Sequence, residues 1–190
     1  MQTGNETIAC EDARYPARLT QRLGADAPPK ITALGNFDLL ALPKTALFCS
    51  AKCPGSVILP TYDQAAKWRD TGRCVISGFH SPVEKECLHI LLRGDAPVIL
   101  CPARGMLLRL PAQWAITVAS GRMLILSAFA ATANRVTAGL ATRRNDLVAA
   151  LADEVFIAHI TIGGQLEQLA KRLQGLEVPI IFSPSVANER

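Results

Sequence analysis

Aromatic residues are scarce in this chain, and their scarcity bears on which ligands it can hold. Phenylalanine, tyrosine and tryptophan together make up 5% of the 190 residues. Proteins that bind single strands on stacking platforms depend on such rings for affinity. The formal net charge is +4, with the positive charge spread along the chain. This mild excess is compatible with a nucleic-acid partner but is not diagnostic of one.

Long apolar runs and a signal sequence are also missing. No uncharged apolar stretch reaches the roughly 18 residues that a membrane-spanning helix requires. The first residues, MQTGNETIACEDARYP, show no basic region followed by an apolar one. The sequence therefore predicts a cytoplasmic protein with no membrane partner. Its hydrophobic fraction of 49% is enough for a closed core and argues against disorder.

Motifs of nucleophilic catalysis and nucleotide hydrolysis are absent too. The sequence has no G-x-S-x-G elbow, no Walker lysine loop and no G-x-G-x-x-G after the first expected strand. Glu167 suits acid–base work by its place in the sequence, but a first-turn acid that stabilises its helix is the favoured interpretation. Cys49 and Cys53 have the spacing of half a metal site, yet no second pair follows, so the six cysteines are expected to be reduced thiols. We expect a non-catalytic protein without cofactor or metal.

Short apolar segments alternate with longer helical patterns along most of the chain. The expected strands are Thr45–Cys49, Cys74–Ser77, Pro97–Cys101, Met123–Ser127, Glu154–Ile160 and Val178–Phe182. The expected helices cover residues 60–71, 82–93, 111–120, 136–152 and 164–174. Each strand is a nearly continuous apolar run, as in strands covered on both faces. This alternation predicts an α/β fold: a Rossmann-like three-layer sandwich with a mostly parallel sheet and helices on both faces.

Helix boundaries are marked by proline and by capping residues. Ser81 precedes Pro82 and lies three residues before Glu84, which is the pattern of a capping box with proline at the first helical position. Pro60 and Pro111 are expected to begin helices in the same way.

The length of the chain suits one domain, or one domain with a short N-terminal extension. Residues 1–44 are rich in proline, glycine and alanine, and we interpret them as an N-terminal extension packed on the core. Residues 45–190 are then the Rossmann-like domain.

Polar and basic residues follow the expected strands where these end. The carboxyl ends of parallel strands share one edge of the sheet, and ligands bind in the crevice outside that edge. The candidate binding residues are Ser50, Lys52, Ser77, Gly78, His80, Arg104, Arg144, Asn145, His159, Gly163 and Gly164. Arg104 is the favoured phosphate ligand, because a guanidinium pairs well with phosphate oxygens. His80 and His159 could form an acid–base pair, although histidines at strand ends are more often structural.

The stretch from Arg143 to Leu169 is the most informative part of the sequence. It predicts a helix with an Arg144-Asn145 pair, an apolar strand, and a Gly163-Gly164 turn that opens a further helix. Amides and the helix dipole at such a turn attract an anion. A tight turn without a ligand also explains the glycines, and Arg143 and Arg144 could lie on a solvated face. The pattern points toward a phosphate-bearing ligand, either a nucleotide or a nucleic acid.

Several short motifs occur here in the order found in the DNA-processing protein A (Smf/DprA) family. They are Tyr15-Pro16, Leu34-Gly35-Asn36, Val75-Ile76-Ser77-Gly78, Leu126-Ser127, Arg144-Asn145 and Ile162-Gly163-Gly164-Gln165-Leu166. Over roughly residues 15–182 the chain resembles that family's Rossmann-like domain. The resemblance implies single-stranded DNA as partner and a homodimer. Three departures from the family's pattern are visible. The family's Gly-Ser-Arg is replaced by Cys49-Ser50-Ala51, and Pro82 should stiffen the loop that begins at Ser77-Gly78. We also expect no winged-helix domain of the kind that some members carry after the Rossmann-like domain.

Two functions stay open on this evidence. The first is a non-catalytic, DprA-like protein that binds single-stranded DNA. Its phosphate contacts would be Lys52, Arg104, Arg144 and the amides of Gly163 and Gly164. The second is a sensor of a nucleotide or nucleotide-derived ligand held at the strand ends. A phosphoribohydrolase-like enzyme ranks below both, because the glycine turn lacks the Gly-Thr pair of those hydrolases. A third alternative is a scaffold that serves only protein–protein contact.

Overall fold

One eight-stranded sheet forms the centre of the part of the chain that the structure, a computed structural model, describes: residues 4–175 and 178–183. Residues 1–3, 176–177 and 184–190, which belong to the predicted 1–44 and 45–190 ranges, lie outside the described residues. The strands lie in the order β1-β2-β6-β5-β4-β3-β7-β8. They are β1 (Glu6–Ala9), β2 (Lys30–Gly35), β3 (Lys44–Cys49), β4 (Cys74–Ser77), β5 (Val98–Leu100), β6 (Met123–Ser127), β7 (Glu154–His159) and β8 (Ile180–Phe182).

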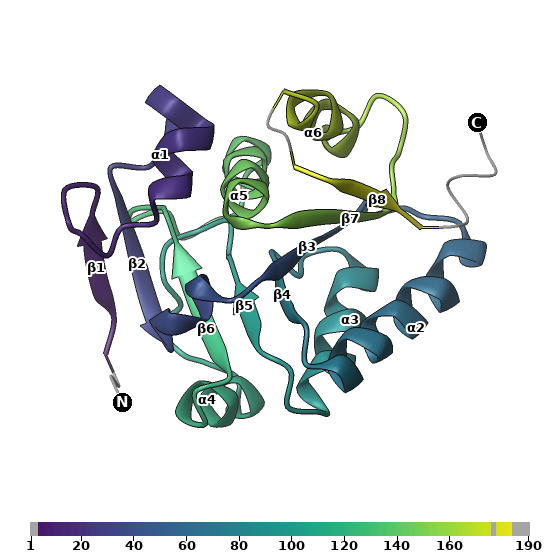
Figure 1. Cartoon of the computed structure of the whole chain (residues 1–190), viewed down its shortest axis with the longest axis horizontal. Helices are drawn as coiled ribbons and strands as arrows, with labels where there is room; N and C mark the ends of the chain where they lie inside the picture. Colours follow the sequence, from purple (N-terminus) through teal and green to yellow (C-terminus); the bar gives the residue numbers. More distant parts are fainter. Residues whose placement is uncertain (1–3, 176–177, 184–190) are drawn as a thin grey trace.

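Helices cover both faces of the sheet (Figure 1). They are α1 (Ala17–Leu23), α2 (Gly55–Thr71), α3 (Pro82–Leu92), α4 (Ala112–Ala119), α5 (Ala138–Leu151) and α6 (Gln165–Leu173), with short 3-10 helices η1 (Gly24–Asp26) and η2 (Phe37–Ala41). Helices α1, α5 and α6 share one apolar core with the sheet, and α2, α3 and α4 share the other. The predicted α/β three-layer architecture is confirmed.

The predicted strands are found because burial on both faces leaves a clear signature in the sequence. All residues of β3, β4, β5 and β6 are buried, so each strand is a nearly continuous apolar run. The two N-terminal strands differ. Strand β1 pairs antiparallel with β2, and β2 pairs antiparallel with β6, whereas the other neighbours are parallel. The N-terminal segment thus contributes two strands to the same sheet.

The direction in which the chain crosses the sheet reverses once within its parallel part. From β3 the chain steps to β4, β5 and β6, and the α5 crossover then returns it to β7 on the other side of β3. The carboxyl ends of β3 and β7 therefore flank the topological switch point, where ligands bind in open α/β sheets.

The N-terminal boundary of α2 differs from the prediction. Pro60 was expected to begin this helix, but the helix begins at Gly55, after the N-cap residue Pro54, and Pro60 lies inside it. The earlier start buries Val57 on the face that also carries Thr61, Ala65 and Trp68. The Thr61 hydroxyl donates to the Val57 carbonyl at 2.7 Å. Packing of this face thus outweighs the hydrogen bond that proline removes. Pro111, in contrast, is the N-cap of α4, and Ser81 and Glu84 form the predicted capping box.

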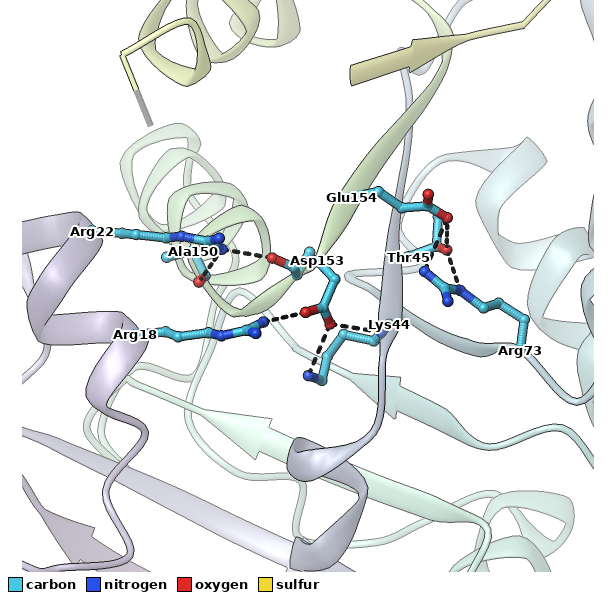
Figure 2. Close-up of polar contacts among 9 residues, drawn as sticks. Arg18, Arg22, Lys44, Thr45, Arg73, Ala150, Asp153 and Glu154 are labelled. Carbon is cyan, nitrogen blue, oxygen red and sulfur yellow. Dashed lines mark hydrogen bonds and ion pairs between the residues drawn. The ribbon is translucent and has the colours of Figure 1, made fainter. Parts of the chain in front are cut away.

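Asp153, at the amino end of β7, holds the N-terminal segment to the sheet (Figure 2). Asp153 Oδ1 accepts from Arg18 Nη1 at 2.6 Å, while its Oδ2 accepts from the Lys44 amide at 2.9 Å and lies 3.5 Å from Lys44 Nζ. Nearby, Arg22 Nη1 donates to the carbonyl oxygens of Ala150 and Ala152 at the end of α5. Asp153 therefore joins α1, β3 and the α5–β7 turn.

Replacement of Asp153 by asparagine should lower the free energy of unfolding by about 2 kcal/mol at pH 7, because the buried Lys44 loses its charged partner. Partial burial raises the pKa of Asp153, but hydrogen bonds from the Lys44 amide and the Arg18 guanidinium, together with the positive charges of both side chains, hold this pKa below its ordinary value. A depressed folded-state pKa gives stability that is present above the unfolded pKa near 3.8 and is lost as pH falls through the folded value.

Urea unfolding of wild type and Asp153→Asn at pH 7 and below pH 3 tests this expectation, and the difference should shrink at the lower pH. Asp63→Asn, on the exposed surface of α2, is the matched control and should change little at either pH. An equal effect of the two substitutions at pH 7 would contradict the assigned role of Asp153.

Candidate functional site

Nine of the eleven predicted site residues fall into two groups at the carboxyl edge of the sheet. Ser77, Gly78, Arg144 and Asn145 come together at the end of β4 and on α5, where all but Gly78 are buried. The second group lies in the loops that follow β3 and β7 and consists of Ser50, Lys52, His159, Gly163 and Gly164. His80 and Arg104 lie in the loops after β4 and β5.

Glu84 occupies the place in the first group where an anion would otherwise bind. Its Oε2 accepts from the amides of His80 at 2.7 Å and Ser81 at 3.1 Å, and its Oε1 accepts from the amide of Cys49 at 2.9 Å. The Glu84 side chain is buried at the N-terminus of α3, where free amides and the helix dipole favour negative charge. The protein's own carboxylate therefore fills this cradle and links the end of β3 to the start of α3.

Ser77 shapes the loop between β4 and α3. Its hydroxyl donates to the Leu47 carbonyl at 2.8 Å and accepts from the Phe79 amide at 3.1 Å. Phe79 adopts φ 45°, a left-handed conformation that costs a non-glycine residue on the order of 1 kcal/mol. The Phe79 ring is buried in the core, and this burial offsets the strain. Ser77 is thus a buried structural group of the site.

Arg144 lies inside the protein against Gly78. Its residue exposure is 5%. Its Nε donates to Asn145 Oδ1 at 2.8 Å, and its Nη1 donates to the Cys101 carbonyl at 3.4 Å. A Cβ at position 78 would lie 1.1 Å from Arg144 Nη1, so only glycine leaves room for the guanidinium. Burial lowers the pKa of Arg144, while the negative charge of Glu84 raises it. Arg144, hydrogen-bonded to Asn145, thus packs against Gly78 in the loop after β4.

The loops at the switch point are fastened to each other. Ser50 Oγ accepts from the Thr161 amide at 3.0 Å, and the Thr161 hydroxyl donates to the Lys52 carbonyl at 3.3 Å. The Ser50 amide also donates to the His159 carbonyl at 3.1 Å. The Lys52 side chain is exposed beside these contacts. Thr161 was not among the predicted site residues, because no sequence motif marks a single threonine in a loop.

The amides of the glycine turn already have partners within the chain. Gly163 donates to Glu167 Oε2 at 2.6 Å, and Gly164 donates to the Thr161 carbonyl at 3.0 Å. Gly163 has φ 75°, which favours glycine at this position. The hydrogen bond from Gly163 and the neighbouring Lys171 lower the pKa of Glu167, which acts as the first-turn acid of α6.

The two histidines are carried by strands that are not neighbours. His80 is exposed just after β4, His159 ends β7, and β3 lies between these strands.

Four cysteine thiols near the sheet are buried. Burial raises the pKa of Cys87 and Cys101 to about 12 and that of Cys49 well above its ordinary value. At neutral pH these groups are protonated thiols.

Arginines without acidic neighbours in the sequence are concentrated in one stretch of the chain. The positive charge is therefore less evenly distributed than the sequence analysis assumed. Residues 96–145 contain six arginines and no aspartate or glutamate. Arg122 lies at the amino end of β6, where its Nε is 3.7 Å from Asp95 Oδ1. Of the other five, Arg104 and Arg109 lie in the loop between β5 and α4, Arg135 lies in the loop between β6 and α5, and Arg143 and Arg144 lie on α5.

Two adjacent loops carry most of these arginines. Residues 101–111 follow β5, and residues 128–137 follow its neighbour β6. The Ser127 hydroxyl donates to the Arg104 carbonyl at 2.7 Å, and the Gly105 amide donates to the Ala133 carbonyl at 3.0 Å. We call these two loops together with Arg143 the basic loop surface.

Cations of the basic loop surface lack carboxylate partners within residues 4–175 and 178–183. Arg109, Arg135 and Arg143 are exposed and form no ion pair with a described residue. Arg104 is half-buried, and its Nε has no hydrogen-bond partner among the described atoms although it is buried. The Arg143 guanidinium lies 5.7 Å from the centre of the Phe129 ring. This edge can therefore attract anions without displacing an acidic side chain.

Comparisons with known proteins give a consistent result. A model of the family described as DNA recombination-mediator protein A matches residues 6–169. No curated protein matches the sequence. Within the described part of the chain, no helix has the length and apolar character needed to cross a membrane.

Solved structures share the fold at low sequence identity. DNA processing protein A from Streptococcus pneumoniae is 18% identical with a TM-score of 0.77, and 93% of this chain matches 62% of that protein. DNA processing protein A from Helicobacter pylori, which has a single-stranded DNA binding mode, is 20% identical with a TM-score of 0.74 and coverages of 95% and 81%. A molybdenum cofactor binding protein from Rippkaea orientalis is 13% identical with a TM-score of 0.51 and coverages of 77% and 80%. This chain thus spans about 62% of the length of the pneumococcal protein.

Replacement of Glu84 by glutamine should lower the free energy of unfolding by about 3 kcal/mol, because an amide N–H₂ would face buried N–H donors. Urea unfolding gives the loss, and hydrogen exchange should show faster exchange of the Cys49, His80 and Ser81 amides. Glu86→Gln on the same helix is the control. Its half-exposed carboxylate pairs with Arg93 and His89, so it should cost less than about 1 kcal/mol. Unchanged exchange of the three amides would contradict the role given to Glu84.

The packing of Gly78 against Arg144 is open to a double-mutant cycle. Gly78→Ala should cost about 3 kcal/mol of unfolding free energy, because the new methyl group displaces the guanidinium. In an Arg144→Ala background the same substitution should cost much less, since the obstructing side chain is gone. Equal costs in the two backgrounds would show that the two residues do not interact.

Proposed function

The chain belongs to the DNA recombination-mediator protein A family, and from this premise we propose that it binds single-stranded DNA through the basic loop surface. The binding mode described for the Helicobacter pylori relative supports single strands as the form of DNA. We propose a non-catalytic role, since binding of this kind needs cations at a fixed spacing and no reacting group. A cytoplasmic homodimer remains part of the proposal.

The observation that carries the proposal is the absence of acidic residues from positions 96–145. Phosphates of a strand repel carboxylates and release counterions when they pair with arginine or lysine. A surface with several arginines and no acid in the same stretch of sequence is therefore suited to a polyanion rather than to a single phosphate. The aromatic content is low, so most of the affinity should come from the strand's backbone.

The predicted contacts take different roles in this proposal. Arg104 lies within the basic loop surface, and its half-buried guanidinium, which forms no ion pair with a described residue, is the proposed phosphate ligand. Lys52 is exposed at the switch point, farther along the same carboxyl edge, where the strand could continue. Arg144 is buried, so we propose that it supports the site by positioning the loop at Gly78. The Gly163 and Gly164 amides would first have to leave Glu167 and the Thr161 carbonyl.

Affinity should fall steeply with salt, and the exposed arginines should set the slope. We expect Arg109→Gln/Arg135→Gln to weaken binding of a labelled single strand on the order of tenfold at ~0.1 M salt. The slope of log K against log salt should become shallower by about 1.4, since each lost contact with a single strand removes about 0.7. Fluorescence anisotropy at several salt concentrations measures both quantities.

A charge-matched control separates a local effect from net charge. Lys67→Gln/Lys85→Gln removes two exposed cations from α2 and α3, which lie outside the basic loop surface. This variant should keep the wild-type affinity and slope. Equal losses in the two double variants would show that binding depends on net charge alone, and no binding by folded wild type would overturn the proposed function.

A further inference from the structure

Two cysteines flank the loop between β3 and α2, and the proposed function uses neither of them. Cys49 is the last residue of β3, and Cys53 lies two residues before α2 begins at Gly55. The backbone bends at Ala51 and Lys52, between the two cysteines. Both cysteine side chains pack in the same apolar core, which α2 and α3 share with the sheet.

The thiol of Cys53 is a partner of the Cys49 thiol. Burial raises the pKa of Cys49 well above its ordinary value, and Cys53 raises this pKa further, both through its charge and as a hydrogen-bond partner. The bend in the loop and the shared core thus bring two sulfur atoms into contact. A disulfide needs such an approach of two side chains from backbone positions that are already close.

The remaining cysteines are less suited to pair with Cys49. Cys87 on α3 lies in the same core, but it acts on Cys49 through its charge alone, and its own Sγ donates to the Thr61 carbonyl at 4.0 Å. Two further cysteines, Cys74 and Cys101, belong to the core on the opposite face of the sheet, and Cys10 is exposed in the N-terminal segment.

The two thiols of the pair differ in how easily an oxidant from solution can reach them. Cys49 is 4% exposed. Cys53 is half-buried, and its neighbours Lys52 and Pro54 are exposed. Cysteines that respond to oxidants are commonly accessible and have a second, resolving cysteine beside them. In this pair, Cys53 is suited to react first and Cys49 to resolve.

We propose that Cys49 and Cys53 form a reversible disulfide when the protein meets a peroxide. The Cys53 sulfur attacks one oxygen of hydrogen peroxide, the O–O bond breaks, and the products are a sulfenic acid on Cys53 and water. The Cys49 sulfur then attacks the Cys53 sulfur, and the sulfenic oxygen leaves as water with the Cys49 proton. Each sulfur has then lost one electron, and the peroxide has accepted two. A small thiol reverses the step by exchange.

The disulfide would close a covalent ring over the loop at the switch point. This loop is already fastened to the loop after β7, because Ser50 Oγ accepts from the Thr161 amide at 3.0 Å and the Thr161 hydroxyl donates to the Lys52 carbonyl at 3.3 Å. Both contacts are hydrogen bonds that can open and close. A covalent link on the side of α2 should therefore make opening of the loop rarer in the oxidised protein.

Peptide mapping of the oxidised full-length protein tests the proposal. Reduced wild type is treated with hydrogen peroxide, its remaining thiols are blocked with iodoacetamide, and it is cut with trypsin. Cleavage after Lys44, Lys52 and Lys67 places the two cysteines in separate peptides, 45–52 and 53–67, so that mass spectrometry finds them joined only if they are bridged. The joined pair should be the main oxidised product, and dithiothreitol should release it.

Two serine variants serve as test and control. Cys53→Ser should give no joined pair and should leave Cys49 open to alkylation after unfolding. Cys10→Ser removes the exposed thiol and should form the pair as wild type does. Thermal unfolding verifies that both variants are folded. The wild-type map decides the question even if a variant fails to fold: Cys53 recovered as a sulfinic acid, unmodified, or joined to Cys87 overturns the proposal.

Hydrogen exchange tests the effect of the disulfide on the loop. The Ser50 amide donates to the His159 carbonyl, and the Thr161 amide donates to Ser50 Oγ. Both amides should exchange more slowly in the oxidised protein, on the order of tenfold, and dithiothreitol should restore the original rates. Unchanged rates in a fully bridged sample would overturn the assigned effect. None of these measurements uses DNA, so their failure leaves the proposed function standing, and absence of DNA binding leaves the disulfide untouched.

Discussion

The carboxylate of Glu84 fixes the geometry of the carboxyl edge, because it accepts amide hydrogen bonds from the last residue of β3 and from the loop after β4. Cys49 closes β3, while His80 and Ser81 precede α3, and all three donate to this one side chain. The turn thus held includes Gly78, against which Arg144 packs. An internal anion therefore occupies the cradle that open α/β sheets commonly offer to phosphate. In the proposed function, ligand binding is therefore displaced along the edge toward β5 and β6.

The two ends of the strands differ in how their charges are balanced. At the amino end, Asp153 pairs with Arg18 and Lys44 and joins the N-terminal segment to the sheet, while Glu154 pairs with Arg73 (Figure 2). At the carboxyl end of β5 and β6 the chain supplies arginines and no acids. The mild net charge of the whole chain thus conceals an uneven distribution. Salt bridges serve the fold at one end, and unpaired cations are left for a ligand at the other.

The layers could be predicted from the sequence because buried parallel strands are apolar throughout and caps are local. Ser81 and Glu84 need only their own neighbours to form a capping box, so the start of α3 was predicted correctly. The prediction that α2 begins at Pro60 was wrong, because the local preference of proline was outweighed by burial of Val57 on a helix face that only tertiary packing defines.

The candidate site was harder to predict, since its residues act across elements. The Arg144-Asn145 pair reads the same whether it faces solvent or the interior, and its burial depends on Gly78, 66 positions earlier in the sequence. Glu84 was identified as a cap, but its bond to Cys49 depends on how β3 ends. The acid-free stretch was readable from the sequence alone, and it becomes informative once β5 and β6 are known to be neighbours.

The antiparallel pairing of β2 with β6 imposes an order of events on synthesis. Residues 30–35 leave the ribosome early, but their partners at 124–127 follow about ninety residues later, and Asp153, which binds Arg18, later still. At usual translation rates this gap lasts on the order of ten seconds. During that time β2 has no β6 edge to join. The segment that carries β1 and β2 can therefore enter the sheet only after β6 has been made.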